Sequence, residues 1–196
     1  MRGEGEDDGA RGPTRIEPWG RGDLTLLHKC LGDPAMMRHL GGPESPEQLA
    51  TRQTRYEQPD SKQFKIVDEA SGQGIGWVGY WERGEQIYEI GWSVLPGFQG
   101  RGVAGSAALE VIALARAEDK HGFLHAYPSI ENAASNALCR RLGFVLLGPT
   151  DFEYPKGALM RCNDWRLELV ELAAPWPGDR GPSPVPSATP LDDSDR

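Results

Sequence analysis

The sequence is poor in cysteine, in basic residues and in long apolar runs, and each shortage excludes a class of protein. The three cysteines among 196 residues, Cys30, Cys139 and Cys162, are odd in number and widely separated. This excludes a disulfide framework and a Cys-x-x-Cys metal site. His28 and His39 lie near Cys30 without a metal-ligand pattern. We therefore expect reduced thiols and no bound metal.

Basic residues are outnumbered by acidic ones, 21 to 29, which gives a formal net charge of -8. A chain of this charge repels phosphate backbones and anionic lipid, so we expect no nucleic-acid partner. No apolar run approaches the roughly 20 residues that a membrane helix needs, and the polar start of the chain does not resemble a signal peptide. The sequence therefore predicts a cytoplasmic protein with no membrane partner.

The two ends of the chain differ in composition from the middle. Residues 1–14 mix glycine with acidic side chains and hold almost nothing to bury, which predicts a flexible arm. Residues 174–196 are rich in proline and end in aspartates, which predicts a disordered tail in which Trp176 either docks on the domain or stays free. Residues 15–173 are left as one predicted domain.

Apolar periodicity and turn residues predict alternating strands and helices between these ends. Asp33 followed by Pro34, and Ser45 followed by Pro46, are typical of helix starts. We expect strands at 15–19, 63–68, 75–82, 88–95, 123–127, 144–147 and 160–169, and helices at 24–30, 33–38, 45–56, 103–117 and 132–142. Short turns make the second to fourth strands an antiparallel meander, and the helix at 103–117 makes a crossover. The fold class is therefore α+β.

The most informative segment is a glycine-rich loop that lies between the strand at 88–95 and the helix at 103–117. Free N–H groups at a helix N-terminus attract anions, and glycines let a phosphate approach the backbone. An ordinary glycine-rich turn is the alternative. Residues 100–105 also match Gly-x-Gly-x-x-Gly, but four residues separate the strand from Gly100 and the next strand ends without an acid, which disfavours a nicotinamide-binding fold.

Three segments, in order along the chain, carry a resemblance to one family. Residues 31–40 are similar to an Asp-Pro-x-x-Met-Arg helix, residues 99–104 fit (Gln/Arg)-x-x-Gly-x-(Gly/Ala), and residues 131–144 are similar to an Asn-x-x-Ser helix that ends in Leu-Gly-Phe. With these segments the chain resembles the GCN5-related N-acetyltransferases (GNAT), and within them the RimJ/RimL-like branch, over residues 15–169.

The resemblance implies the GNAT fold, with a mixed, mostly antiparallel sheet of about six to seven strands, helices on both faces, and a splayed central strand pair. It implies acetyl-CoA as cosubstrate, the glycine-rich loop on its pyrophosphate, and the strand at 88–95 and the helix at 132–142 along its pantetheine arm. The implied cofactor-binding residues are Trp92, Ser93, Val94, Gln99, Gly100, Arg101, Gly102, Val103, Ala104, Asn132 and Ser135.

Three side chains are candidates for catalysis of acetyl transfer to an amine. The amine must lose a proton before it attacks, and Glu89 is the preferred base because partial burial raises the pKa of a carboxyl. His125 is the rival base, since its ordinary pKa of about 6.5 suits the task. Cys139 stands where many family members carry a Tyr that protonates the leaving thiolate, and Tyr127 or water are alternatives.

The expected acceptor is an amine, either a small molecule or a protein N-terminus, and the expected assembly is a monomer or homodimer. A non-catalytic acyl-CoA-binding module stays open as an alternative, because Cys139 replaces the usual Tyr. A nicotinamide-dependent oxidoreductase is the third possibility.

Overall fold

The computed structural model describes residues 12–83, 86–154 and 159–169. The predicted tail and most of the predicted arm lie outside these residues. No helix among the described residues is both long enough and apolar enough to cross a membrane.

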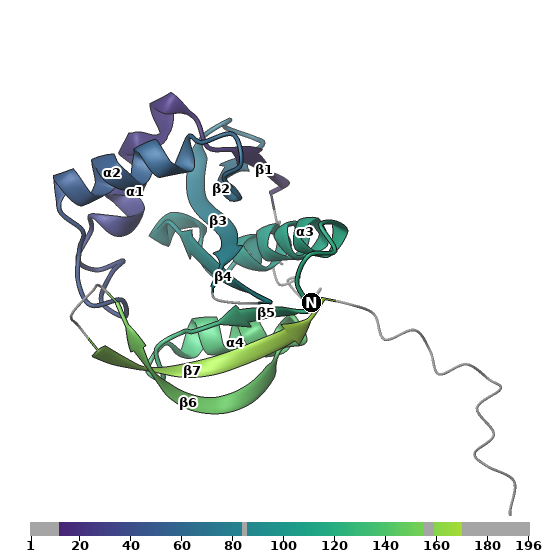
Figure 1. The fold of residues 1–196 in the computed structure, drawn as a ribbon. Helices are drawn as coiled ribbons and strands as arrows, with labels where there is room; N and C mark the ends of the chain where they lie inside the picture. The colour runs from purple at the N-terminus through teal and green to yellow at the C-terminus, as the bar shows by residue number, and fades with distance from the viewer. Residues whose placement is uncertain (1–11, 84–85, 155–158, 170–196) are drawn as a thin grey trace, which may run out of the picture.

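The described chain contains seven strands and four α-helices. Figure 1 shows how they are arranged. The strands are β1 (Thr14–Pro18), β2 (Gln63–Asp68), β3 (Gly74–Glu82), β4 (Ile87–Val94), β5 (Phe123–Ala126), β6 (Val145–Glu153) and β7 (Leu159–Glu168). The helices are α1 (Leu24–Leu31), α2 (Pro46–Tyr56), α3 (Val103–Ala117) and α4 (Ala133–Arg141), with short 3-10 turns η1 (Arg21–Asp23) and η2 (Pro96–Phe98).

The strands form one sheet in the order β1-β2-β3-β4-β5-β7-β6. Every neighbouring pair is antiparallel except β4 and β5, which run parallel because α3 crosses between them. This arrangement confirms the predicted α+β class and the mixed, mostly antiparallel sheet.

Helices cover both faces of the sheet, and each face has its own apolar core. The core beneath α1 and α2 includes Leu27, Leu49 and Trp77. The core beneath α3 and α4 is larger and includes Val78 and Val111. Because side chains alternate along β3, Trp77 and Val78 point into opposite cores, and one strand connects the two layers.

Local sequence accounts for the clearest helix boundaries. The Ser45 hydroxyl accepts the N–H of Gln48 at 3.3 Å, and the Gln48 side chain accepts the N–H of Ser45 at 2.7 Å, which forms a capping box at the start of α2. At the start of α4 the side chain of Asn132 accepts the N–H of Ser135, a single cap without the reciprocal bond. The predicted helix at 33–38 is wrong. Asp33 does accept the N–H groups of Ala35 and Met36, but residues 34–41 form consecutive turns.

Candidate active site

The glycine-rich loop forms an anion cradle at the start of α3. Gly100 and Gly102 have φ angles of 75° and 81°, a left-handed conformation that glycine adopts without strain. Ser106 is the first residue whose N–H donates within the helix, to the carbonyl of Gly102 at 3.0 Å. The N–H groups of residues 102–105 precede this bond and have no intrahelical acceptor. These four consecutive donors and the positive end of the helix dipole fit a phosphate or pyrophosphate group.

The side chains of the loop fix its position rather than fill its concave side. The Gln99 Nε2 group donates to the carbonyl of Val94 at 2.8 Å, which ties the loop to the end of β4. The Arg101 guanidinium lies over the Phe98 ring at 5.7 Å. A Cβ atom added at Gly97 or Gly100 would have no heavy atom within 4 Å. The space beside the loop backbone at these two positions is therefore open to a ligand.

β4 and β5 separate before β4 reaches the loop, and a gap opens between them. Their pairing consists of Ile87 with Phe123, Tyr88 with Leu124, and Glu89 with His125, and there it ends. The edge of β4 from residue 90 to residue 94, which includes the predicted residues Trp92, Ser93 and Val94, therefore has no strand partner on its β5 side.

The N-terminus of α4 lies on the other side of this gap. The Asn132 Oδ1 atom accepts the N–H of Ser135 at 3.1 Å, so the Asn132 side chain serves as a helix cap. Asn132, Ser135 and Trp92 all line the same cavity. The structure thus brings these three predicted residues together. Ser93 and Val94 lie at the end of β4 and are not among the residues that line the cavity, and the predicted residues 99–104 form the loop and the start of α3.

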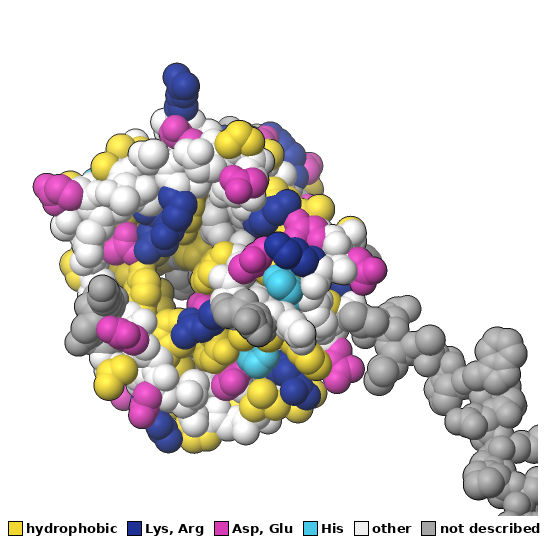
Figure 2. Space-filling view, in the orientation of Figure 1, with side chains coloured by type: hydrophobic (Ala, Val, Ile, Leu, Met, Phe, Trp, Pro, Cys, Tyr) yellow, Lys and Arg dark blue, Asp and Glu magenta, His cyan; other side chains and the backbone are white. Residues whose placement is uncertain are grey.

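The cavity has a volume of about 770 Å³ and extends from this gap across the α1–α2 face of the sheet. Its walls carry aromatic, acidic and basic side chains. Figure 2 shows one mouth of this hollow near the centre of the molecule, with hydrophobic, basic and acidic side chains around it. The wall residues used below are Arg52, Trp77, Trp81, Arg83, Glu89, Tyr127, Phe152 and Tyr154.

Glu89 lines the cavity at the point where β4 and β5 part. Its side chain is 10% exposed, and its Oε2 atom accepts a hydrogen bond from the Arg83 Nη1 group at 2.5 Å. Burial raises the pKa of Glu89 above that of an exposed glutamate, and the Arg83 guanidinium opposes this shift. The structure therefore places the predicted base in the cavity, with a raised pKa and a cationic partner.

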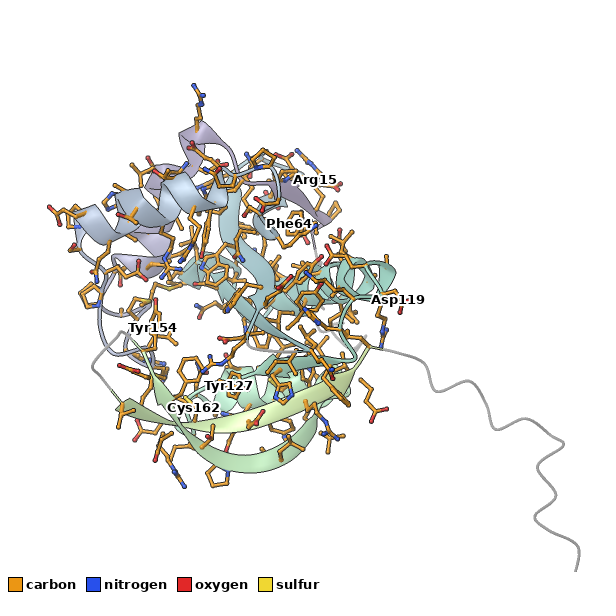
Figure 3. The ribbon with its side chains drawn as sticks, in the orientation of Figure 1. Arg15, Phe64, Asp119, Tyr127, Tyr154 and Cys162 are labelled. Carbon is orange, nitrogen blue, oxygen red and sulfur yellow. The ribbon has the colours of Figure 1, made fainter. Side chains whose placement is uncertain are left out.

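His125 lies beside Glu89 on β5 but is not among the described residues that line the cavity. Its Nδ1 atom is 2.7 Å from Asp164 Oδ1 and 3.3 Å from the Tyr127 hydroxyl. Because an ionised Asp164 can only accept, we assign the proton to Nδ1, donated to Asp164. Tyr127 itself reaches the cavity, and Figure 3 shows it in the middle of the molecule, in front of β5.

Cys139 lies in the apolar core beneath α3 and α4, with no exposed surface and no share in the cavity wall. Burial raises the pKa of its thiol to about 12. The structure thus separates Cys139 from Glu89 and from the residues of the gap.

A polar bridge closes one end of the cavity, and sequence reasoning missed it. The Arg52 guanidinium donates to Glu44, to the Tyr56 hydroxyl at 3.0 Å and to the Tyr154 hydroxyl at 3.0 Å. The Tyr154 hydroxyl in turn donates to Glu44 at 2.5 Å. The bridge connects α2 to the residue that follows β6, and Figure 3 shows Tyr154 at this side of the molecule. No cluster of three or more potential metal ligands occurs among the described residues.

Comparison with known proteins agrees with this geometry. A family model described as an acetyltransferase (GNAT) domain matches residues 14–145. No curated protein matches the chain.

Many solved structures share the fold. The acetyltransferase (GNAT family) from Bacillus anthracis is 20% identical, with a TM-score of 0.69 over 80% of this chain and 95% of its own. The protein yncA from Salmonella typhimurium, solved with acetyl-CoA, is 20% identical, with a TM-score of 0.67 over 84% and 98%. Spermidine N-acetyltransferase from Vibrio cholerae, solved with CoA and spermine, is 18% identical, with a TM-score of 0.67 over 80% and 95%.

Proposed function

Because the chain belongs to the GNAT acetyltransferases, we propose that it transfers the acetyl group of acetyl-CoA to a primary amine by direct attack in a ternary complex. The observation that carries the proposal is the gap between β4 and β5. This gap lies between an anion cradle on one side and a buried carboxylate in an aromatic cavity on the other.

The residues around the gap fit acetyl-CoA, which supplies an acetyl group activated as a thioester. The free N–H groups of residues 102–105 hold the pyrophosphate, and the glycines let it approach. The unpaired edge of β4 at Trp92, Ser93 and Val94 offers strand-like hydrogen bonds to the pantetheine amides. Asn132 and Ser135 contact the arm from the α4 side. The structure of yncA with acetyl-CoA supports this assignment through its shared fold.

Glu89 is the proposed general base. An alkylammonium with a pKa of about 10.4 is protonated at neutral pH, so a proton must leave before the nitrogen lone pair can attack. A carboxylate whose pKa burial has raised is a stronger base than an exposed one, and Glu89 lines the cavity. His125, oriented by Asp164, remains the alternative base through an intervening water or Tyr127.

Tyr127 suits protonation of the departing thiolate better than Cys139 does. Its hydroxyl lies at the end of β5, where the gap opens, and burial raises its pKa to about 12, which keeps it protonated. Cys139 has no exposed surface from which to donate.

The proposed acceptor is a protein N-terminus or a small-molecule amine. The resemblance of residues 31–40 to the RimJ/RimL-like branch favours an N-terminus. The likeness to a spermidine acetyltransferase solved with spermine favours a small polyamine. We place the protein in the cytoplasm, acting as a monomer or homodimer.

Thiol release from acetyl-CoA across a panel of amines tests the proposal. The panel contains spermidine, free amino acids and short peptides with unblocked N-termini. Release that depends on one class of amine supports the proposed enzyme. Binding of acetyl-CoA without release for any amine would favour the non-catalytic acyl-CoA-binding module, which the buried Cys139 at the usual Tyr position makes a real alternative.

A further inference from the structure

The Arg83 side chain occupies a position inside the cavity that has the properties of a cation-binding slot. Its guanidinium donates to Glu89 at 2.5 Å and lies over two aromatic faces, at 4.8 Å from the centre of the Tyr127 ring and 4.3 Å from that of Phe152. A carboxylate together with two ring faces is the environment in which proteins hold organic cations.

The slot exists independently of Arg83. Glu89 comes from β4, Phe152 comes from β6, and Tyr127 follows β5, so three separate strands build it. All three residues line the cavity, next to the gap between β4 and β5. The slot is therefore part of the space into which an acceptor must enter.

The guanidinium is held mainly by the slot itself. Arg83 follows the end of β3, where its backbone N–H donates to the carbonyl of Ile87 at 3.0 Å. Its side chain is 41% exposed, and its hydrogen bond, ion pair and ring contacts within the described chain are those with Glu89 and the two rings. The side chain can therefore leave the slot by rotating about its own bonds, without breaking a strand.

We propose that the Arg83 guanidinium occupies the subsite for the acceptor's ammonium group, and that the acceptor binds as a cation that displaces it. The inference rests on the proposed function for the identity of the acceptor, but not for the existence of the slot. A buried carboxylate needs a cationic partner, so Glu89 exchanges one cation for another rather than losing its partner.

This exchange also places the reacting nitrogen. The ammonium that replaces the guanidinium lies against Glu89 and transfers one proton to Oε2. The nitrogen lone pair then attacks the acetyl carbonyl, and the C–S bond breaks with its electron pair going to sulfur. The second nitrogen proton is lost as the amide forms, sulfur takes up one proton, and one proton in total goes to solvent. Acceptors without a cationic group do not displace Arg83.

Direct binding of methylguanidinium, the headgroup of arginine itself, tests the slot without any turnover. Calorimetry at one fixed pH compares the wild type with Arg83→Ala and with the double variant Arg83→Ala/Glu89→Gln. Arg161→Ala is the matched control, because Arg161 pairs with Asp151 at 2.8 Å on the surface, outside the cavity wall. We expect Arg83→Ala to bind methylguanidinium at least tenfold more tightly than the other three proteins.

Kinetics give the second readout. The KM for the best amine of the panel should fall several-fold in Arg83→Ala and at least twofold in Arg83→Lys, which keeps a positive charge and tests the idea if Arg83→Ala does not fold. Two results would overturn the inference. One is a folded Arg83→Ala variant that binds no methylguanidinium. The other is a KM for the amine that rises or does not change in Arg83→Lys. If methylguanidinium binds but no amine is acetylated, the slot stands and the proposed enzyme activity fails.

Discussion

Replacing Asn136 by alanine should destabilise the protein strongly, because one buried carboxamide satisfies four partners at once. Asn136 lies in α4 with 9% of its surface exposed. Its Nδ2 group donates to the carbonyls of Ser129 and Asn132 at 2.9 and 2.8 Å. Its Oδ1 atom accepts from Asn163 at 2.7 Å and from the Trp165 indole at 2.9 Å. The side chain thereby fixes α4 to β7 and to the segment that enters α4.

The magnitude follows from what the substitution leaves unpaired. Trp165 is 3% exposed, so its indole N–H loses its partner in a site that water does not reach. A buried polar group without a partner costs about 1–3 kcal/mol, and Asn163 and Ser129 lose partners in part-buried positions. We expect a loss of about 2–5 kcal/mol in the free energy of unfolding, or a Tm lower by roughly 5–15 °C for a chain of this size.

Urea denaturation followed by tryptophan fluorescence measures this loss, and Asn163→Ala is the control. Asn163 provides one of the four hydrogen bonds, and Asn136 keeps Trp165 as a partner for the same oxygen. The control should cost about 1 kcal/mol. If Asn136→Ala unfolds within about 0.5 kcal/mol of the wild type, the reasoning from unsatisfied groups is refuted.

The remaining predictions concern the two candidate proton-transfer residues. Glu89→Gln keeps the shape of the side chain but cannot accept a proton. In steady-state assays kcat should therefore fall by about 10²- to 10⁴-fold, with little change in CoA affinity. Near-normal turnover would contradict the assignment of Glu89 as the base. In the wild type, kcat/KM should rise with pH as Glu89 ionises, with a midpoint above the ordinary glutamate pKa of about 4.3, because burial raises its pKa. A midpoint at or below the ordinary value argues against this base. Cys139→Ala should lower the free energy of unfolding through a lost core contact and should change kcat by a few-fold at most. A Cys139→Ala variant that folds and binds CoA but is inactive would show that Cys139 takes part in the reaction.

Elements defined by local signals were predicted well from the sequence. The helix at 103–117 has the same bounds in the structure, since an apolar stripe and a glycine at its start are both local features. The start of α2 at Pro46 likewise follows from Ser45 and its capping box.

Elements that depend on pairing were predicted less well. The strand predicted at 144–147 is the longer β6, Val145–Glu153. β6 continues through Gly148 and Pro149 because it is the edge strand, where proline is tolerated, and because a register shift between Leu146 and Gly148 accommodates them. The Asp33-Pro34 signal failed because an aspartate that accepts N–H groups two or three residues on begins a turn as readily as a helix.

In the candidate site, too, features set by local sequence were predicted better than contacts between distant segments. The glycine-rich loop and Glu89 were found from one stretch of sequence. The residues that define their surroundings come from distant segments: Asp164 beside His125, and Arg52 and Tyr154 in the bridge. Arg83 carried a weaker signal: it precedes its partner Glu89 closely in the sequence, but nothing in the sequence shows that the two side chains meet.

Calorimetric titration with acetyl-CoA tests the central claim most directly. Gly102→Asp places a carboxylate and a Cβ in the proposed pyrophosphate cradle at a left-handed position, with a φ of 81°. Gly72→Asp makes the same substitution at a φ of 68° in the turn between β2 and β3, with no heavy atom within 4 Å of the new Cβ. The account predicts that the wild type and Gly72→Asp bind acetyl-CoA alike and that Gly102→Asp binds at least about 100-fold more weakly. Unchanged acetyl-CoA affinity in a folded Gly102→Asp variant would contradict it.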